Sequence, residues 1–252
     1  MTGRGNHTYL IVSSGEATLV DAGTGEAGHL SALEKHLEDG AARLTNVLVT
    51  HAHPDHVSGV TALAAAHREA IFAKYPSPAE DAQYRVAWKP LADGDEILAG
   101  GERLVALHTP GHSPDHIAFW HRASGTLFTG DLVLQGGSVM IPWREGGDLG
   151  QYLRSLERLV ALGPKRLLPA HGPEPNDPVG LLRSHLDHRR QRERQILAAL
   201  EAGRDSVQAI AETIYDGLDS RLLPAAYETV RAHLEKLKSE GRVVEDAARW
   251  ML

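Results

Sequence analysis

Short apolar runs alternate with helical patterns over about the first 180 residues of the chain. Leu30, Leu33 and Leu37 fall on one face of a predicted helix over 29–40, which ends at Gly40. Further helices are predicted over 57–67 and 148–163. Runs typical of strands lie at 8–14, 17–23, 44–50, 103–109, 116–121, 126–131 and 165–172. Because strands and helices are mixed along the segment, the pattern predicts an α/β domain.

The last third of the chain has a different pattern. It predicts a long helix over 180–203, a short helix over 205–215, a third helix over 223–241 and a two-stranded hairpin over 242–252. Three helices followed by a hairpin are typical of a winged-helix module. We therefore expect two domains, residues 1–178 and residues 179–252.

Composition is that of an ordinary globular protein, with 42% hydrophobic and 23% charged residues in a chain of 252. No apolar run approaches the roughly 18 residues of a membrane-spanning helix, and the N-terminus lacks the apolar stretch of a secretory signal. A cytoplasmic protein with no membrane partner is expected. The chain has no cysteine, which excludes disulfides and thiolate metal ligands. Its formal charge of −7 argues against a basic nucleic-acid binder.

The stretch VTHAHPDHVSG, residues 49–59, crowds four titratable side chains directly after a predicted strand. These are His51, His53, Asp55 and His56. The imidazoles would repel one another if they were protonated, whereas a bound cation makes the crowding favourable. Neutral imidazole and carboxylate groups are good ligands for zinc and similar divalent ions. The stretch therefore predicts a metal site rather than a solvated, histidine-rich turn.

The local geometry favours two ions. Pro54 breaks a helix at this point, which excludes the HExxH arrangement, in which two ligands lie one helical turn apart. We expect instead a strand end, a tight loop and a helix that starts near Asp55. His51 and His53 should leave the strand end on the same side, because alternate residues share a face. The bend turns Asp55 and His56 elsewhere, so one loop can serve two metal ions.

Later strand ends supply further candidate ligands. His112 follows a strand and a Pro-Gly turn, Asp131 follows the strand in LFTGD, and His171 follows the strand in LLPAHG. Asp21, after the second predicted strand, is a candidate to support the histidines from behind. His116 is expected either to form a hydrogen bond of the same supporting kind or to be a satisfied core histidine.

The stretch GTGEAG, residues 23–28, fits the GxGxxG pattern of dinucleotide-binding sites. That pattern also needs an acidic residue at the end of the next strand, where this chain has Thr50 and His51. A tight turn is therefore the favoured interpretation.

Taken in order, the motifs HAHPDH, TPGHSPDH, FTGD and PAHG resemble the motif series of the metallo-β-lactamase superfamily over about residues 6–175. The resemblance implies a four-layer αββα sandwich, with two sheets face to face, helices outside and metals at one edge. Zn²⁺ is expected at both positions, with Mn²⁺ or Fe²⁺ as alternatives. The resemblance implies that His51, His53 and His112 hold one ion, that Asp55, His56 and His171 hold the other, and that Asp131 bridges them.

Departures from the family pattern narrow the expected function. His53 stands where diiron oxygen-reducing relatives usually carry Glu, which favours hydrolysis. A β-lactamase of the common subclass would carry a cysteine ligand, which this chain lacks. The C-terminal module, with HRRQRERQIL after the last ligand, looks like the lactamase-beta-like endoribonuclease branch. The resemblance implies a dinuclear hydrolase that cleaves phosphodiester bonds of single-stranded RNA with a metal-bridging hydroxide. Asp55 is the expected catalytic residue, orienting the hydroxide or passing a proton to the leaving group.

Two other functions remain open. A hydrolase of small thioesters, esters or lactones of the glyoxalase II type would use the same metals, although the glutathione-binding signature is absent. A winged-helix DNA-binding regulator would place helix 223–241 in the major groove, although the module carries no net charge. A homodimer is a further expected assembly. The candidate substrate contacts are Trp143 and Arg144, in a loop expected at the mouth of the pocket, and Arg189 and Arg190; packing against the C-terminal module is the preferred alternative for Trp143.

Overall fold

The computed structural model describes residues 5–252 and contains two five-stranded sheets. In the first sheet the strands lie in the order β1-β2-β3-β4-β5, and β1 is the only antiparallel member. Its strands are β1 (Tyr9–Ser13), β2 (Glu16–Val20), β3 (Arg43–Leu48), β4 (Ile71–Lys74) and β5 (Trp88–Pro90).

The second sheet has the order β10-β9-β8-β7-β6, in which only β9 and β10 pair in parallel. Its strands are β6 (Glu96–Ala99), β7 (Glu102–His108), β8 (Ile117–His121), β9 (Thr126–Gly130) and β10 (Arg166–Pro169).

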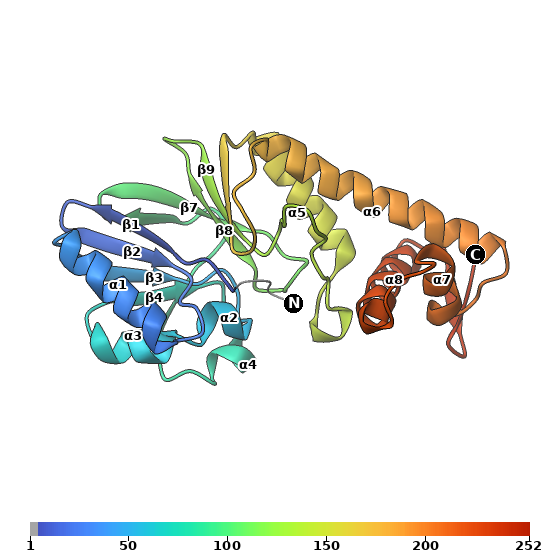
Figure 1. The fold of residues 1–252 in the computed structure, drawn as a ribbon, viewed down its shortest axis with the longest axis horizontal. Helices are drawn as coiled ribbons and strands as arrows, with labels where there is room; N and C mark the ends of the chain where they lie inside the picture. Colours follow the sequence, from blue (N-terminus) through green and yellow to red (C-terminus); the bar gives the residue numbers. More distant parts are fainter. Residues whose placement is uncertain (1–4) are drawn as a thin grey trace.

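The helices of the first domain cover the outer faces of the sheets (Figure 1). The first sheet is covered by α1 (Ala27–Asp39), α2 (Pro54–Val57) and α3 (Val60–Ala66), and the second by α5 (Leu149–Leu162). A short helix α4 (Pro78–Asp81) and a 3₁₀ turn η1 (Trp143–Glu145) lie in connecting segments.

Successive side chains of a strand point to opposite faces of its sheet, so each sheet contributes to two cores. In β8, Ile117 and Phe119 enter the core between the two sheets, whereas Ala118 and Trp120 enter the core beneath helix α5. A third core joins Leu33 and Leu37 of α1 to the outer face of the first sheet. The predicted four-layer αββα sandwich is therefore confirmed.

The C-terminal module has its own core. It is built from α6 (Pro178–Glu201), α7 (Val207–Ile214), the 3₁₀ turn η2 (Ser220–Leu222), α8 (Leu223–Ser239) and the hairpin β11 (Val244–Asp246) and β12 (Arg249–Met251). Trp250 of the hairpin and Val230 and Leu234 of α8 are fully buried in it. Three helices and a two-stranded wing agree with the predicted winged-helix arrangement.

Helix α6 belongs to both parts of the molecule. Leu182 and Leu186 in its first half pack in the core beneath the second sheet, whereas Ile196 and Leu200 pack in the core of the module. The predicted division between residues 178 and 179 falls in the first turn of this helix. Figure 1 shows α6 running from the sandwich to the module as one long rod. No helix in the described part of the chain combines the length and the apolar character that crossing a membrane requires.

The structure differs from the sequence prediction in several elements. The helix expected over 57–67 is divided at Ser58–Gly59, because the N–H of Gly59 donates to the carbonyl of Gly23 instead of continuing the helix. A Cβ at Gly59 would lie 2.1 Å from the carbonyl oxygen of Ala22, so the two segments approach too closely for any other residue. Strands β4, β5 and β6 and helix α4, each of three or four residues, were not predicted.

Candidate metal centre

Seven side chains meet at the edge where strands of both sheets end. His51 follows β3, His112 follows β7, Asp131 follows β9 and His171 follows β10. The other three come from the segment around α2, where His53 precedes the helix and Asp55 and His56 lie in it. Strand ends of both sheets therefore bring together residues separated by up to 120 positions in the chain.

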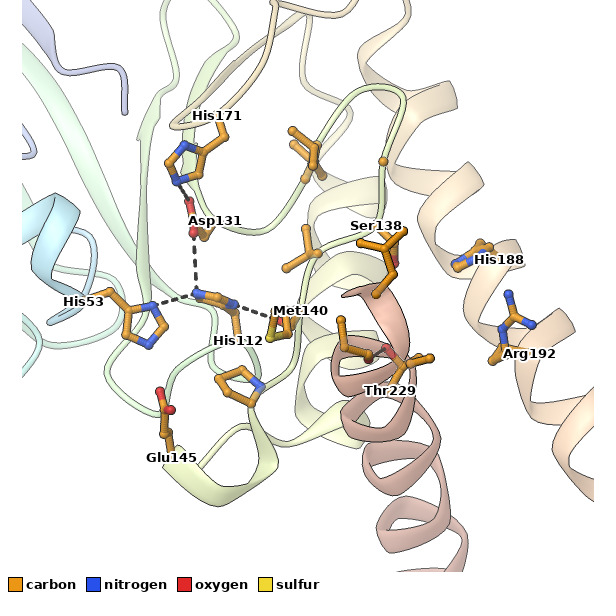
Figure 2. A pocket seen from close by; sticks show the side chains of 18 of the residues that line it. His53, His112, Asp131, Ser138, Met140, Glu145, His171, His188, Arg192 and Thr229 are labelled. Atoms are coloured by element: carbon orange, nitrogen blue, oxygen red, sulfur yellow. Dashed lines mark hydrogen bonds and ion pairs between the residues drawn. The ribbon is translucent and has the colours of Figure 1, made fainter. Parts of the chain in front are cut away.

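One group consists of three imidazoles and a carboxylate. The Nδ1 atom of His53 lies 2.9 Å from Nε2 of His51 and 3.0 Å from Nε2 of His112. Oδ2 of Asp131 lies 3.5 Å from Nε2 of His112. These four residues place one ligand atom each within 4.8 Å of one another. Figure 2 shows His53, His112 and Asp131 pointing toward a common centre.

The second group consists of Asp55, His56 and His171. Nε2 of His171 lies 3.2 Å from Oδ2 of Asp55, and Nε2 of His56 lies 3.7 Å from the same oxygen. The other carboxylate oxygen of Asp131, Oδ1, lies 3.3 Å from His171 and 3.4 Å from His56. Asp131 thus presents one oxygen to each group, as a bridging ligand would.

The donor atoms fit divalent cations. Four of them are buried and have no hydrogen-bond partner within residues 5–252: Oδ2 of Asp55, Nε2 of His56, Oδ1 of Asp131 and Nε2 of His171. Buried polar atoms are rarely left unpaired. Ligand atoms at about 2.0–2.2 Å from a tetrahedral zinc ion lie about 3.3–3.6 Å from one another, close to the separations in the second group.

Four of the histidines are oriented by hydrogen bonds at Nδ1, the ring nitrogen that faces away from the ligand groups. Nδ1 of His112 donates to the carbonyl of Met140 at 2.7 Å, and Nδ1 of His171 donates to the carbonyl of Gly5 at 2.9 Å. Nδ1 of His51 lies 3.1 Å from the hydroxyl of Thr50, and Nδ1 of His56 lies 2.8 Å from Oδ2 of Asp21. Each of these bonds leaves the Nε2 lone pair for a metal ion.

Asp21 lies behind His56, where the sequence placed it. Its Oδ2 accepts from Nδ1 of His56, and its Oδ1 accepts from the backbone N–H of Thr50 at 2.8 Å. The Thr50 hydroxyl also donates to Oδ2 at 3.1 Å. Asp21 has a left-handed backbone conformation with φ of 62°, which Asp adopts more readily than most residues. One buried carboxylate thus fixes both a ligand and the end of β3.

His116 supports the bridging residue. The backbone N–H of Asp131 donates to Nε2 of His116 at 3.2 Å, and Nδ1 of His116 lies 2.9 Å from the hydroxyl of Thr109. Burial keeps the pKa of His116 well below its usual range, so the ring is neutral and can accept this hydrogen bond. Both expectations for His116 therefore apply, because it is a satisfied buried histidine that also positions Asp131.

The electrostatics of the centre differ between its two groups. Burial, together with the neighbouring imidazoles of His56 and His112, holds the pKa of His51 well below its usual range, and burial lowers the pKa of His112 to about 4. Although burial opposes the effect, Asp21 and Asp131 raise the pKa of His56 to about 10. Asp131 and Asp55 likewise raise the pKa of His171 to about 10, against the effect of burial. Positive charge is therefore favoured at the second group, and neutral imidazole at the first.

A cavity of about 770 Å³ opens beside the ligands and reaches the C-terminal module (Figure 2). At one side it is lined by metal-site residues that include His53, Asp55 and Asp131. The loop before η1 contributes Ser138 and Met140, as the sequence predicted for the mouth of the pocket. The far wall comes from the module, with residues of α6, α8 and the segment that joins α7 to α8; they are His188, Arg192, Tyr215, Leu218, Leu222, Ala225, Ala226 and Thr229.

The four expected substrate contacts lie outside this cavity. Arg189 is only 2% exposed, donates to the carbonyl of Val139 and lies over the ring of Tyr152, so it holds α6 to the sandwich. Arg190 points to Glu157 of α5, at 3.0 Å. The expectation that these two arginines contact substrate does not agree with their positions.

Trp143 and Arg144 connect the loop to the module. Trp143 packs under the guanidinium of Arg231, 4.6 Å from the ring, which is the packing role preferred over base stacking. Arg144 is 79% exposed and lies 3.8 Å from Glu228 of α8.

Sequence reasoning missed two sets of residues at the site. His188 and Arg192 are one helical turn apart on α6, and only the docking of the module shows that this face borders the cavity. Near the ligands, Nδ2 of Asn6 donates to the carbonyl of Asp55 at 2.7 Å and Gly5 supports His171. The contacts that involve Gly5, Asp55 and Met140 use backbone carbonyls, which carry no sequence signal.

Comparison with known proteins agrees with this architecture. The family described as "Metallo-beta-lactamase superfamily" matches residues 1–171, and the "Beta-lactamase associated winged helix domain" matches residues 206–250. A "Beta-lactamase-like protein 2 homolog" of Drosophila melanogaster is 31% identical over 255 residues, covering 96% of this chain and 85% of the fly protein. An "Atrochrysone carboxyl ACP thioesterase" of Cryptosporiopsis sp. is 30% identical over 256 residues, covering 95% of this chain and 76% of the fungal protein.

A solved structure extends the similarity to the whole chain. A metallo-beta-lactamase family protein of Thermus thermophilus is 26% identical and superposes with a TM-score of 0.77. The match covers 98% of this chain and 93% of the Thermus chain, so the module and the sandwich are both included.

Proposed function

Because this chain belongs to the metallo-beta-lactamase superfamily and is a hydrolase of that family, we propose that it hydrolyses small acyl thioesters. One observation carries the proposal: the cavity that begins at the metal ligands is lined mainly by apolar side chains. The relative from Cryptosporiopsis, which is a thioesterase by name, supports the same reaction class.

The lining of the cavity suits an acyl group. Val133, Leu134 and Val139 contribute to one wall, and Leu218 and Leu222 contribute to the wall formed by the module. A volume of about 770 Å³ is within the range of about 300–1,000 Å³ typical of small-molecule sites. Each buried methylene stabilises a bound acyl chain by about 0.8 kcal/mol. The cavity therefore favours a substrate with a substantial apolar part next to its reacting carbonyl.

The positions of the basic residues favour a small substrate over RNA. Binding of single-stranded RNA depends on cationic side chains along the path of the backbone and on stacking surfaces for bases. Arg189 is buried, Arg190 pairs with Glu157, and Trp143 is covered by Arg231. Cleavage of single-stranded RNA stays a prediction from the sequence and forms one arm of the test below.

DNA binding by the module is disfavoured by its ion pairs. Arg231 of α8 pairs with Glu235 and Glu245 at 2.5 and 2.9 Å. Lys236 pairs with Glu193 at 2.6 Å, and Lys238 pairs with Glu245 at 2.7 Å. These cations are neutralised within the protein, and the start of α8 lines the cavity instead of facing outward.

The residues of this chain have separable tasks in the proposed reaction. Divalent ions held by the two ligand groups would polarise the thioester carbonyl and supply a nucleophile from water at neutral pH. Asp55 lies where the ligands meet the cavity, so its carboxylate can take up a proton and return it to the leaving thiolate. Asp131, held by His116, fixes the spacing of the two groups, and the apolar walls orient the acyl chain and exclude water.

The test compares matched substrates on one metal-loaded sample of known metal content. The substrates are an octanoyl thioester, the oxygen ester with the same acyl group and an unstructured RNA oligonucleotide. We expect kcat/KM to be highest for the thioester. Asp131→Ala should lower the metal content of both groups and reduce turnover by about 100-fold or more. Asp187→Ala, which removes an exposed carboxylate of α6, is the control and should leave both unchanged.

Two outcomes would contradict the proposal. RNA cleavage with no thioester turnover would favour the phosphodiester reaction implied by the sequence resemblance. Full metal content and full turnover in Asp131→Ala would remove the bridging role on which the site geometry depends.

A further inference from the structure

We propose that Arg192, with His188 one turn before it on α6, binds an anionic group of the substrate at the wall of the cavity opposite the metal ligands. The inference rests on the proposed function, because it identifies which acyl thioesters the cavity selects. Figure 2 shows both side chains facing the cavity from α6, across from His53, His112 and Asp131.

Arg192 is held in place without a carboxylate partner. Its guanidinium stacks on the ring of Tyr215 at 4.2 Å, and its Nη1 donates to the side-chain oxygen of Gln195 at 2.9 Å. Its Nε is buried and has no hydrogen-bond partner among the residues that the structure describes. Within residues 5–252, no carboxylate forms an ion pair with it, in contrast to Arg190 on the same helix. The side chain is thus oriented by uncharged contacts, with hydrogen-bonding capacity left over.

Two buried residues near Arg192 also lack anionic partners among the described residues. Arg189, one turn away and almost fully buried, also has no carboxylate partner in the described part of the chain, and its Nε is unpaired. Burial and, to a smaller degree, the charge of Arg192 lower the pKa of Arg189. His233 of α8 is fully buried, and neither ring nitrogen has a partner among the described residues. Burial and the charges of Arg189 and Lys236 keep its pKa well below the usual range.

This charge distribution points to an anion as the missing partner. Guanidinium groups bind carboxylates and phosphates through several N–H donors in one plane. A low-dielectric wall concentrates the field of such cations and attracts negative groups, even though the whole protein carries a formal charge of −7. Between Arg192 and the metal ligands the cavity is mainly apolar. The ligand that matches both ends is an apolar chain with its reacting carbonyl at the metals and a carboxylate or phosphate at Arg192.

The two sources of the anion differ in where they are attached. A carboxylate would lie at the far end of the acyl group, whereas a phosphate would belong to the carrier of the thiol. Both present oxygens to the same guanidinium, so the shared chemistry is an anionic oxygen group, and the two ligand arms of the experiment separate the sources.

The experiment measures binding by calorimetry to the metal-loaded protein, with three uncleavable ligands built on one straight alkyl chain. Each has an amide at one end; the other end is a carboxylate, a phosphate or a second amide. Arg192→Gln should weaken the preferred anionic ligand about tenfold or more, the range for hydrogen bonds to charged groups, and change the uncharged ligand by less than about twofold. Arg192→Lys should restore part of the lost affinity.

Arg194→Gln is the matched control, because Arg194 is exposed on the same helix and lies outside the cavity. It removes the same charge and should leave all three affinities unchanged. Unchanged affinity of Arg192→Gln for the uncharged ligand shows that the cavity is intact. Equal binding of both anionic ligands to wild type and Arg192→Gln would overturn the inference and place any anion at the metal ligands instead. Binding needs no turnover, so failure of the thioesterase proposal would appear separately, as the absence of hydrolysis by the wild-type protein.

Discussion

At the scale of single residues, the centre depends on pairs in which one side chain is a ligand and another group holds it. His56 is held by Asp21 and Asp131 by His116, whereas His112 and His171 are held by backbone carbonyls. Partners of this kind fix the tautomer and the orientation of the ligand, and their loss typically costs about 10- to 100-fold in metal affinity.

Asp21→Asn tests the most demanding of these pairs. Asn tolerates the left-handed backbone at this position, but it has one acceptor oxygen where Asp21 uses two. The amide nitrogen must then face either the N–H of Thr50 or Nδ1 of His56, and one hydrogen bond is lost. We expect the second metal group to bind about 10- to 100-fold more weakly, measured by chelator competition. The first group serves as the internal reference, and equal weakening of both groups would contradict the assignment.

The ligands could be predicted from sequence, whereas most of the groups that form hydrogen bonds to them could not. His51, His53 and His56 stand out because several metal-binding side chains follow one apolar strand. The carbonyl of Met140 carries no such signal, because any residue would supply the same oxygen. Arg192 was missed for a related reason: its function depends on how the module docks, and on its own it resembles any solvated arginine of a helix.

At the scale of elements, short turns between strands and helices set the positions of the ligands. Gly111 lies in the turn directly before His112 and has a φ of 137°. A Cβ at this position would lie 2.3 Å from both the backbone nitrogen and Cα of Tyr152 in α5. The carbonyl of Gly111 also accepts from the N–H of Asp148, the residue that caps α5. The turn and the helix are therefore packed backbone to backbone.

Gly111→Ala should destabilise the protein and loosen the first metal group. Overpacking of this kind costs about 1–3 kcal/mol, and the strained backbone adds to it. For a chain of this size the melting temperature should fall by roughly 2–4 °C per kcal/mol. Gly28→Ala is the control: nothing lies within 4 Å of its Cβ, so it should be neutral or slightly stabilising. A Gly111→Ala protein as stable as Gly28→Ala would show that α5 is not fixed by this turn.

The elements that were not predicted are too short to show a periodic pattern of hydrophobic residues. Strands β4 and β5 have four and three residues, too few for a period of two to be recognised. Both are strands because they extend the parallel edge started by β3, which is a tertiary effect. The long elements α5, α6 and α8, with 14, 24 and 17 residues, were predicted to within a few residues of their observed bounds.

At the scale of the whole molecule, the C-terminal module forms one wall of the cavity beside the metal ligands. Helix α6 shares its side chains between two cores, and α8 places Ala232 in the core beneath the second sheet. The start of α8 and the segment after α7 then close the apolar wall opposite the metal ligands. The sequence predicted the metal-ligand motifs and the module, but this closure depends on how the module docks on the sandwich, which no local pattern describes.

The rate of thioester hydrolysis as a function of acyl chain length tests this account most directly. In a series of straight-chain thioesters with one thiol, each added methylene enters the apolar cavity and contributes about 0.8 kcal/mol. We predict that kcat/KM rises about fourfold per methylene, until the chain fills the cavity of about 770 Å³ and the rise stops. A value of kcat/KM that is independent of chain length, or that falls from the shortest member onward, would contradict an acyl-binding role for the cavity.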